Sequence, residues 1–382
     1  MSNNESYIGP EEIVRKKKEY LIPCAYHFFK KPIQLVKGEM QYLFDHTGKR
    51  YIDCYAGVSV VTAGHCNPEI TKKTCEQICK LQHTTTLYLN QPIVDLAERL
   101  ANVTPEGLQK SFFCASGSEA NEGAILLSQL FTKRHEYLAL KNGLHGRTKL
   151  TMSLTGLSFW RTDPTPVGGI SFVPNPNCFR CDFDLKYPEC DLKCAEYIKT
   201  VIETSTSKEV AAMIAETIQG NGGVIVPPPE YFKRVKAILE QYGALLITDE
   251  IQSGFGRTGK MFAIEHWGVV PDIMTMAKAL GNGIPIASFI TNNDIAASYI
   301  RPGASTFGGN PVAAVTALAT LDVIEKQNLI ANARELGACL NGLLLELKGK
   351  YAIIGDVRGK GLFQGAELVK NGKEPASEET DI

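Results

Sequence analysis

The chain has 382 residues, of which 44% are hydrophobic and 21% are charged, and its formal net charge is −1. This composition is typical of a soluble globular protein, and the length predicts two to three domains at about 150 residues each. The nearly balanced charge argues against nucleic acid or an anionic membrane as the main partner.

The N-terminal part of the chain predicts a short helix, a hairpin and two further helices. An amphipathic pattern covers residues 10–20, and apolar stretches flank a turn signal at Asp45–Gly48 within residues 35–54. Helical spacing of apolar residues returns at residues 70–82 and 91–101. These periodicities are the main indication of helices and hairpins in a single sequence.

From Gln109 onward, short apolar runs alternate with helical patterns. Residues 111–131 read as a strand, a Gly/Ser turn and a long helix, and a further helix is expected over residues 231–242. Further strands are expected at residues 137–140, 210–215, 244–247, 273–276 and 286–291. This succession predicts an α/β fold with a mostly parallel sheet that is covered by helices on both faces.

After residue 311 the pattern changes to two long helices, at residues 312–325 and 329–347, and to one or two strands within residues 356–368. We therefore expect a large domain over residues 69–311. Residues 1–68 and 312–382 are expected to form a smaller α+β domain built from both chain ends.

Two side chains follow neighbouring apolar runs of the predicted sheet. Asp249 ends the first run, and Lys278 follows the second by two residues. Ligands of open α/β sheets bind beyond the carboxyl ends of the strands, so adjacent strands would bring this pair to one rim. Pyridoxal phosphate (PLP) chemistry needs such a pair, because a lysine forms a Schiff base with its aldehyde and an acid pairs with its ring nitrogen. Lys278 stands between two alanines, where desolvation would make its amine nucleophilic.

The segment SGSEANE at residues 116–122 connects a predicted strand to a predicted helix. A helix N-terminus offers unpaired N–H groups and the positive end of the helix dipole, so this turn could bind a phosphate. An ordinary strand–helix turn with Ser116 or Ser118 as N-cap is the alternative.

A competing interpretation comes from GFGRTG at residues 254–259, which matches the dinucleotide fingerprint G-x-G-x-x-G with Asp272 further on. Two features argue against it. Residues 249–253 separate the strand from the glycines, and Asp272 precedes the second strand although the fingerprint acid should end it. A loop is the favoured interpretation.

The chain contains eleven cysteines. An odd number in a long chain without an apolar signal region or a transmembrane run is typical of reduced thiols in the cytoplasm. Four of them form a C-x2-C-x8-C-x3-C pattern, at Cys178, Cys181, Cys190 and Cys194. They could hold a zinc ion or pack a loop as reduced thiols; we assign no metal to them.

Several motifs together resemble the class III aminotransferases of the fold type I PLP family over nearly the whole chain. The matching stretches are SGSEANE, LHGRT, ETIQGNGG, ITDEIQSGFGRTGKMFA, PDIMTMAKALGNG and STFGGNP. The N-terminal QYLFDHTGKRYIDCYAGV and GHCNPE, with the four-cysteine loop, are most similar to the alanine–glyoxylate and β-aminoisobutyrate–pyruvate branch.

The resemblance implies PLP as cofactor and assigns roles around it. Lys278 matches the Schiff-base lysine that also moves the proton, and Asp249 matches the partner of the ring nitrogen. Gln252 matches the residue that is hydrogen-bonded to the phenolic oxygen of the ring. Gly117 and Ser118 match the phosphate-binding turn.

Further roles concern the surroundings of the cofactor. His145 and Glu216 match residues beside it, and Leu144 stands where an aromatic residue usually stacks on the ring. Arg147 matches an arginine that holds the distal carboxylate of ω-amino acids. Thr306 matches a residue that reaches the phosphate of the neighbouring subunit, which implies a homodimer.

Three departures from the family pattern affect the expected function. Thr217 replaces a proline, and Asn221 replaces a glutamate of the 4-aminobutyrate and ornithine branches. Family members continue past the equivalent of Ile382 with the arginine that clamps the α-carboxylate. This implies a C-terminally truncated small domain, with apolar surface exposed on residues 329–347, or a carboxylate held by another residue.

The resemblance implies a transaminase that moves an amino group from alanine or a β- or ω-amino acid to a keto acid such as pyruvate or glyoxylate. Three alternatives remain open. They are a 4-aminobutyrate- or ornithine-type ω-aminotransferase, another PLP reaction such as an aminomutase, racemase or decarboxylase, and an inactive truncated chain.

Overall fold

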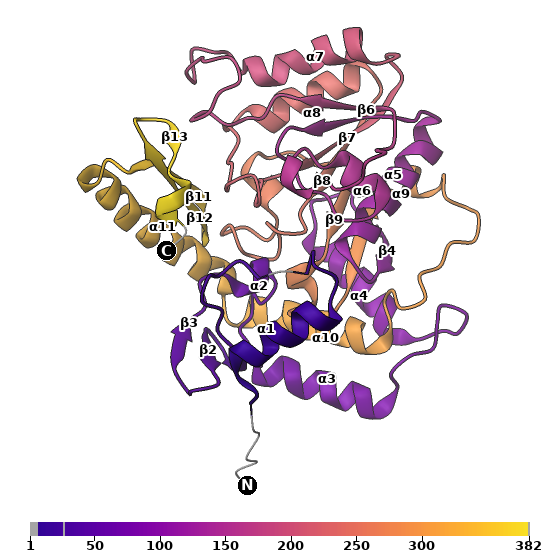
Figure 1. The fold of residues 1–382 in the computed structure, drawn as a ribbon. Coiled ribbons are helices and arrows are strands. Elements are labelled where there is room, and N and C mark those ends of the chain that lie inside the picture. Colours follow the sequence, from indigo (N-terminus) through magenta and orange to yellow (C-terminus); the bar gives the residue numbers. More distant parts are fainter. Residues whose placement is uncertain (1–6, 26, 381–382) are drawn as a thin grey trace.

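A computed structural model describes residues 7–25 and 27–380, and a seven-stranded sheet forms its centre (Figure 1). The spatial order is β4 (Lys110–Cys114), β10 (Ala287–Thr291), β9 (Ile273–Met276), β8 (Leu245–Asp249), β7 (Val210–Glu216), β5 (Glu136–Leu140) and β6 (Ile170–Val173). β10 runs in the opposite direction to the other six strands of this sheet. The predicted α/β fold with a mostly parallel sheet is confirmed.

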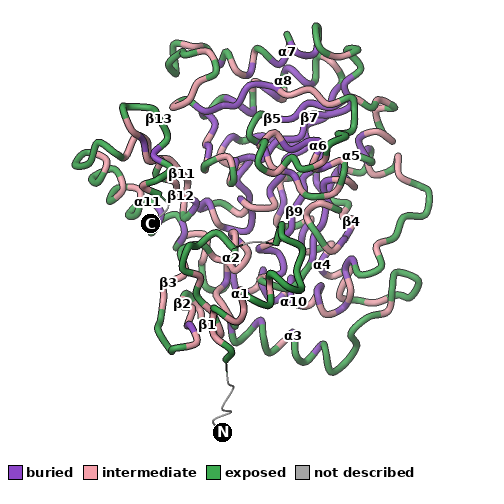
Figure 2. The backbone as a smooth tube through the Cα atoms, in the orientation of Figure 1, coloured by how far each residue is buried: buried purple, intermediate pink, exposed green. Residues whose placement is uncertain are grey.

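Helices cover both faces of the sheet because its central strands are apolar on both sides. Every residue of β7, β8 and β9 is buried (Figure 2). One face packs against α5 (Gly117–Thr132), α6 (Lys149–Leu154) and α9 (Asn293–Ala296). The other packs against α4 (Gln91–Val103), α7 (Lys193–Ser205), α8 (Tyr231–Gln241) and α10 (Pro311–Lys326). Burial of apolar area on two faces is the main stabilising contribution in such a layered fold.

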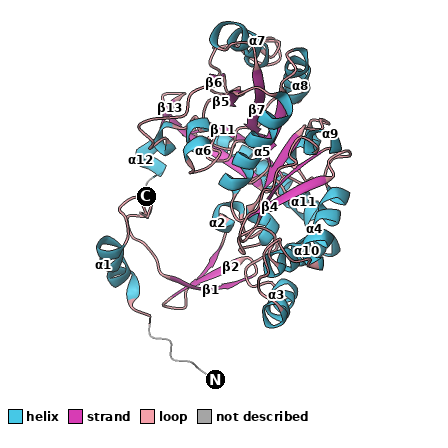
Figure 3. Ribbon diagram, turned by 90° about the vertical axis from the view of Figure 1, so that its right-hand side faces the viewer, coloured by secondary structure: helices cyan, strands magenta, loops and turns pink. Residues whose placement is uncertain are grey.

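The N-terminal segment forms α1 (Gly9–Tyr20) and a separate antiparallel sheet of β1 (Leu35–Glu39), β2 (Tyr42–Asp45) and β3 (Arg50–Ile52). The predicted hairpin thus has a third strand, and its predicted turn joins β2 to β3. Asp45 shapes this turn by accepting hydrogen bonds from the backbone of Thr47 and Lys49. The short α2 (Ala56–Ser59) and the helix α3 (Pro68–Lys80) follow. In Figure 3, α1 and β1 lie at the end of the molecule opposite α7.

The C-terminal segment contains α11 (Leu329–Lys350), the antiparallel strands β11 (Ile354–Lys360), β12 (Phe363–Lys370) and β13 (Glu374–Pro375), and α12 (Ser377–Thr380). Of α11, only Ala333 and Gly337 are buried. The apolar surface expected on this helix is present, because its exposed side chains include Leu336, Leu340, Leu343, Leu345 and Leu347.

A joint made of glycines connects α11, the β11–β12 turn and the loop at residues 254–259. A Cβ atom at Gly337 would overlap the backbone of Gly361, and one at Gly361 would overlap the backbone of Thr258. A Cβ atom at Gly259 would lie 2.9 Å from Cβ of Arg334. The contacts at Gly337 and Gly361 are therefore backbone against backbone, and none of the three positions in this glycine joint leaves room for a side chain.

Some elements lie outside the sequence-based expectations. The strand β6 and the helices α6 and α7 fill the stretch between the predicted strands at residues 137–140 and 210–215. Within the described ranges, no helix combines the length and apolarity that crossing a membrane requires. The domain division at residues 68 and 311 stays a prediction.

Candidate active site

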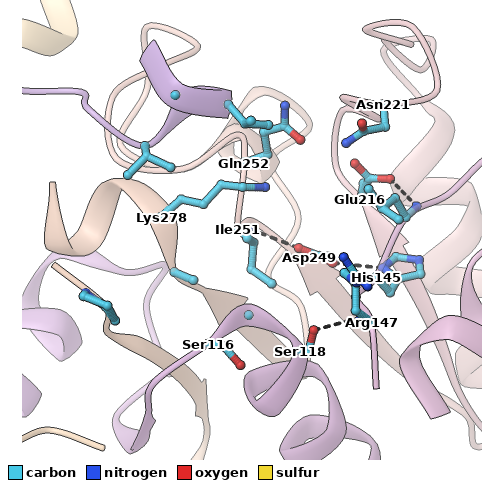
Figure 4. A pocket seen from close by; sticks show the side chains of 18 of the residues that line it. Ser116, Ser118, His145, Arg147, Glu216, Asn221, Asp249, Ile251, Gln252 and Lys278 are labelled. Carbon is cyan, nitrogen blue, oxygen red and sulfur yellow. Dashed lines mark hydrogen bonds and ion pairs between the residues drawn. The ribbon is translucent and has the colours of Figure 1, made fainter. Parts of the chain in front are cut away.

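Asp249 and Lys278 meet at the carboxyl-end rim of the sheet, as the sequence predicts for neighbouring strands. β8 and β9 are adjacent and parallel, and Asp249, the last residue of β8, pairs in register with Thr275 of β9. Lys278 begins a short 3-10 helix, η3 (Lys278–Gly281), two residues after β9 ends. Both side chains line one pocket of about 860 Å³ (Figure 4).

Lys278 combines an uncommon backbone conformation with a buried amine. Its φ angle is +43°, a left-handed value that is uncommon for a residue with a side chain and is found at functional sites. Burial lowers the pKa of Lys278, while the charges of Asp249 and Glu216 partly oppose this effect. Desolvation thus increases the share of neutral amine that is able to attack a carbonyl carbon.

Nearly all of the predicted site residues line this same pocket. They are Gly117, Ser118, Leu144, His145, Arg147, Glu216, Asp249, Gln252 and Lys278. Thr306 does not line it; this residue is exposed on a loop outside the pocket. Asn221, at the position that departs from the 4-aminobutyrate branch, is a pocket residue as well.

The N-terminus of α5 forms the turn that the sequence predicts to bind a phosphate. Ser116 is the N-cap, and its hydroxyl accepts a hydrogen bond from the amide of Glu119. The carboxylate of Glu119 in turn accepts hydrogen bonds from the amides of Ala115 and Ser116. This capping box leaves the amides of Gly117 and Ser118 without an intrahelical acceptor. The N-cap interpretation is confirmed, and the turn still offers two amides to an anion.

Asp249 is surrounded by hydrogen-bond donors. Its Oδ2 atom accepts from Nδ2 of Asn121 at 2.9 Å and lies 2.9 Å from Nδ1 of His145. Its Oδ1 atom accepts from the backbone amide of Ile251 at 3.1 Å. These three neighbours come from separate segments of the chain and together fix the position of the carboxylate.

Glu216 ends β7 and lies on the side of the pocket where Figure 4 places Asn221. Its two oxygens accept hydrogen bonds from the amides of Leu144 at 2.8 Å and Gly220 at 2.9 Å. Burial raises the pKa of Glu216 to about 7, against an opposing contribution from His145. Glu216 therefore holds the loop that carries Leu144 and also supplies a titratable group to the pocket.

The residues present fit PLP. Space for a ligand close to the phosphate turn depends on Gly117, where a Cβ atom would lie 2.9 Å from Cδ1 of Ile251, another pocket residue. The buried Nε2 atom of His145 has no hydrogen-bond partner within the described part of the chain. A phosphate turn, a partly desolvated lysine and a buried carboxylate thus surround one cavity. This fold and this site define a PLP-dependent enzyme.

Comparison with known proteins agrees with the site. The model of the aminotransferase class-III family matches residues 26–380. The chain belongs to this family and is a PLP-dependent class III aminotransferase.

The relatives share most of the chain. The chain is 42% identical over 379 residues to a protein of Arabidopsis thaliana named alanine–glyoxylate aminotransferase 2 homolog 2, mitochondrial. The aligned region covers 98% of this chain and 78% of that protein. The chain is also 42% identical over 366 residues to the leucine/methionine racemase of Thermococcus litoralis, with 94% and 82% covered. Among solved structures, an amine transaminase from an uncultivated Pseudomonas species in its PLP-bound form is similar at a TM-score of 0.86. Its sequence identity is 32%, over 90% of this chain and 82% of that one.

The dinucleotide interpretation of GFGRTG is wrong. No α-helix follows these glycines directly, because the next element is the short 3-10 helix η2 (Ala263–His266). Gly259 belongs to the glycine joint, and Gly256 packs against Ile330 of α11. The carboxylate of Asp272 accepts hydrogen bonds from Lys236 and from the amide of Leu246 in β8. It therefore stabilises the sheet and is not placed to bind the ribose of a dinucleotide.

The four-cysteine loop encloses a small cavity of about 20 Å³. Within the described ranges, no group of three or more histidine, cysteine, aspartate or glutamate residues is arranged to hold a metal ion. Burial raises the pKa of the Cys194 thiol to about 12, which favours the protonated form. The arrangement favours thiols that pack a loop.

Sequence reasoning missed two groups of residues. Asn121 and Thr275 support Asp249 from behind; a polar residue within the apolar run IMTM was a signal for the second of them. The apolar wall of the pocket was also missed, because its members come from distant segments and show no periodic pattern. It includes Phe28, Tyr55, Val58, Val60, Phe159, Trp160, Ile284 and Ile286.

Proposed function

We propose that this aminotransferase moves the amino group of alanine or of a β- or ω-amino acid to a small keto acid such as pyruvate or glyoxylate. The observation that carries the proposal is that Lys278 and Arg147 both line the same pocket. One side chain supplies an amine at the reacting centre, and the other supplies a cation for a carboxylate. The relative from Arabidopsis, named for alanine and glyoxylate, supports this choice of substrates.

When bound, PLP supplies an aldehyde that condenses with amines and a protonated ring that withdraws electrons. The amides of Gly117 and Ser118 would hold its phosphate, Asp249 its ring nitrogen and Gln252 its phenolic oxygen. Leu144 would cover the ring with an aliphatic contact, without the aromatic contribution of about 0.5–1.5 kcal/mol that a stacked ring can add. The amine of Lys278 would take the proton from the α-carbon of the donor and deliver it to the former aldehyde carbon of the cofactor, which is the proton shift that transamination requires.

Arg147 is the candidate holder of the substrate carboxylate. Among the described residues that line the pocket, it is the only arginine. Its backbone amide is anchored by the hydroxyl of Ser118 at 3.0 Å, which places it next to the phosphate turn. Its guanidinium has no ion-pair partner within the described ranges and can form a bidentate pair with a carboxylate.

A homodimer is part of the proposal. Thr306 lies on an exposed loop, and large apolar side chains are exposed on this loop and on the one near residue 88. They are Leu87, Tyr88, Leu89, Ile300 and Phe307. The ring of His83 lies 5.6 Å from that of Phe307, so the two loops form one surface. Contiguous exposed apolar surface of this kind favours association of copies. Sedimentation of the PLP-loaded protein tests this, and a monomer at micromolar concentration would contradict it.

We also propose a cytoplasmic location and retain the predicted division into a large and a small domain. All eleven cysteines are free thiols, which is typical of a reducing compartment. Limited proteolysis tests the division, because cleavage is expected near residues 68 and 311.

Racemisation of an apolar amino acid is the second candidate. The racemase of Thermococcus litoralis is as similar in sequence as the Arabidopsis protein. The apolar wall of the pocket also suits leucine or methionine side chains. The 4-aminobutyrate and ornithine alternatives are less well supported, because Asn221 stands where those branches carry a glutamate.

A panel of donors tests the proposal. The PLP-loaded enzyme is mixed with alanine, β-aminoisobutyrate, 4-aminobutyrate, ornithine or L-leucine, and its absorbance spectrum is followed without an acceptor. Transamination converts the cofactor to its amine form, whereas racemisation leaves the spectrum unchanged and produces D-leucine. An aminomutase or a decarboxylase would instead give an isomeric amino acid or carbon dioxide.

Lys278→Ala is the companion variant. It is expected to lose the visible band of the lysine-bound cofactor, while Lys260→Ala, an exposed lysine of the same segment, keeps it. A Lys278→Ala protein that retains this band would overturn the mechanism. If adding PLP to the unmodified chain produces no band of the lysine-bound cofactor, the protein is inactive.

A further inference from the structure

A chain of buried polar side chains lies behind Asp249, on the side away from the pocket. The hydroxyl of Thr275 donates to Oδ1 of Asn121 at 2.7 Å. Nδ2 of Asn121 donates to Oδ2 of Asp249 at 2.9 Å and to the backbone carbonyl of His145 at 2.7 Å. Asn121 and Thr275 are completely buried, and neither lines the pocket.

The hydrogen-bond partners fix the orientation of the Asn121 amide. The carbonyl of His145 only accepts hydrogen bonds, so it must face the NH2 group. The Thr275 hydroxyl then faces the amide oxygen as a donor. An inverted amide would place two acceptors together and leave buried donors unpaired, which is unfavourable in a dry interior.

This fixed amide limits the rotation of the Asp249 carboxylate. Oδ2 receives donors from two elements, Asn121 of α5 and His145 of the loop after β5. Among the described residues, Oδ1 receives only the amide of Ile251, at 3.1 Å, and keeps a lone pair for another donor. Because Asp249 itself lines the pocket, its remaining acceptor capacity is available to a ligand there.

We propose that Asn121, oriented by Thr275, is a positioning residue that holds the Asp249 carboxylate for the ring nitrogen of PLP. The inference rests on the assigned role of Asp249. Removing the Asn121 donor leaves a buried carboxylate with one strong donor fewer, so the carboxylate rotates more freely and its charge is less stabilised. The enzyme then holds PLP more weakly, and the protonated ring nitrogen loses stability.

The experiment compares Asn121→Leu and Thr275→Val with two matched variants. Thr275→Ser keeps the hydroxyl. Thr248→Val removes a buried hydroxyl of the adjacent strand that has no hydrogen-bond partner in the described chain. The first readout is the apparent Kd of PLP by absorbance titration of the cofactor-free protein. The second is the pH midpoint at which the visible band of the lysine-bound cofactor titrates.

The expected results follow from the loss of a hydrogen bond to a charged group. Asn121→Leu raises the Kd of PLP about tenfold, and Thr275→Val raises it about threefold. In both variants the pH midpoint moves upward, because a ring nitrogen that is less protonated withdraws fewer electrons. Thr275→Ser and Thr248→Val stay within about twofold of the unmodified enzyme in Kd and keep its midpoint.

Two further variants separate the possible failures. If Asp249→Asn changes both readouts but Asn121→Leu and Thr275→Val change neither, the positioning role is wrong and the cofactor site stands. If Asp249→Asn itself changes neither readout, the assignment of Asp249 fails first. In the double variant Asn121→Leu with Asp249→Asn, the effect on Kd should be smaller than the sum of the single effects. If Asn121→Leu does not fold, Thr275→Val decides alone, and an unchanged pH midpoint overturns the proposal.

Discussion

Nδ1 of His145 lies 2.9 Å from Oδ2 of Asp249, and both side chains are almost completely buried. Asp249 already accepts hydrogen bonds from Asn121 and from the amide of Ile251, so both of its oxygens act as acceptors in this cluster. The proton of this contact therefore belongs to Nδ1 of His145. The imidazole is thus a donor that stabilises the charge of the acid.

Replacing His145 by phenylalanine removes this donor at nearly constant shape. We expect the Kd of PLP to rise by about 10- to 100-fold, because a hydrogen bond to a charged group contributes about 1.5–3 kcal/mol. Absorbance titration of the cofactor-free protein measures this. His135→Phe, at an exposed site, is the control and should bind PLP normally. Equal affinities of the two variants would contradict the role of His145.

The raised pKa of Glu216 makes stability depend on pH. The ordinary pKa is 4.5 and the folded value is about 7, so the folded protein binds the proton more tightly than the unfolded chain. The stabilising contribution is complete below about pH 4.5 and is lost as the pH rises through about 7. Between pH 5 and pH 8, the cofactor-free protein should lose up to about 3 kcal/mol of unfolding free energy relative to Glu216→Gln.

Urea unfolding at a series of pH values measures this difference. Glu216→Gln also places its NH2 group near the amides of Leu144 and Gly220, which shifts its curve by a constant amount. The slope with pH is therefore the decisive quantity. Glu98→Gln, an exposed control, should keep the slope of the unmodified protein. Parallel curves for Glu216→Gln and the unmodified protein would show that Glu216 does not titrate in this range.

The role of Arg147 can be separated from general damage to the pocket by the choice of donor. Arg147→Ala should raise KM for 4-aminobutyrate or β-aminoisobutyrate by about 10- to 100-fold, since a charge-assisted pair is lost. For 1-phenylethylamine, which has no carboxylate, KM should change by less than about twofold. Arg147→Lys should recover only part of the loss, because it lacks the planar fork. Similar losses for donors with and without a carboxylate would argue against the assignment.

Two glycines of α11 provide a matched test of the glycine joint. A Cβ atom at Gly337 would overlap the backbone of Gly361, whereas one at Gly342 meets no atom within 4 Å. Gly342→Ala should stabilise the protein by about 0.5–1 kcal/mol through helix propensity. Gly337→Ala should destabilise it by about 1–3 kcal/mol, because overpacking forces the backbones apart. Chemical unfolding of both variants measures the difference, and a stabilised Gly337→Ala protein would be incompatible with this packing.

The sequence predicts the fold well where local patterns are strong. The buried strands β7, β8 and β9 are short, mainly apolar runs, and the long helices have clear periodicity. It does not predict that β10 alone is antiparallel, because strand direction depends on how the chain returns to the sheet. The strand β6 was missed because its four residues, Ile170–Val173, form a short and only partly buried run at the sheet edge.

The residues of the active site also differ in how well the sequence predicts them. The meeting of Asp249 and Lys278 could be predicted, because one ends a strand, the other lies two residues after the next strand, and both carry reactive groups. Asn121 could not, since its role depends on a contact with a residue 128 positions away in the chain. Thr306 illustrates a third case, because a residue that is expected to serve another subunit cannot be judged from a single chain.

The glycine joint has a consequence for how the enzyme loses activity on heating. The loop that begins after Asp249 carries Gln252 into the pocket and then runs through Thr258 beneath the β11–β12 turn. Since backbone atoms of Gly337, Gly361 and Thr258 meet directly in this joint, few side-chain rotamers are available there to absorb a displacement. Detachment of the C-terminal strands would therefore free this loop while the buried centre of the large sheet is still intact. Release of the cofactor should then precede cooperative unfolding, as an early loss of visible absorbance below the main thermal transition.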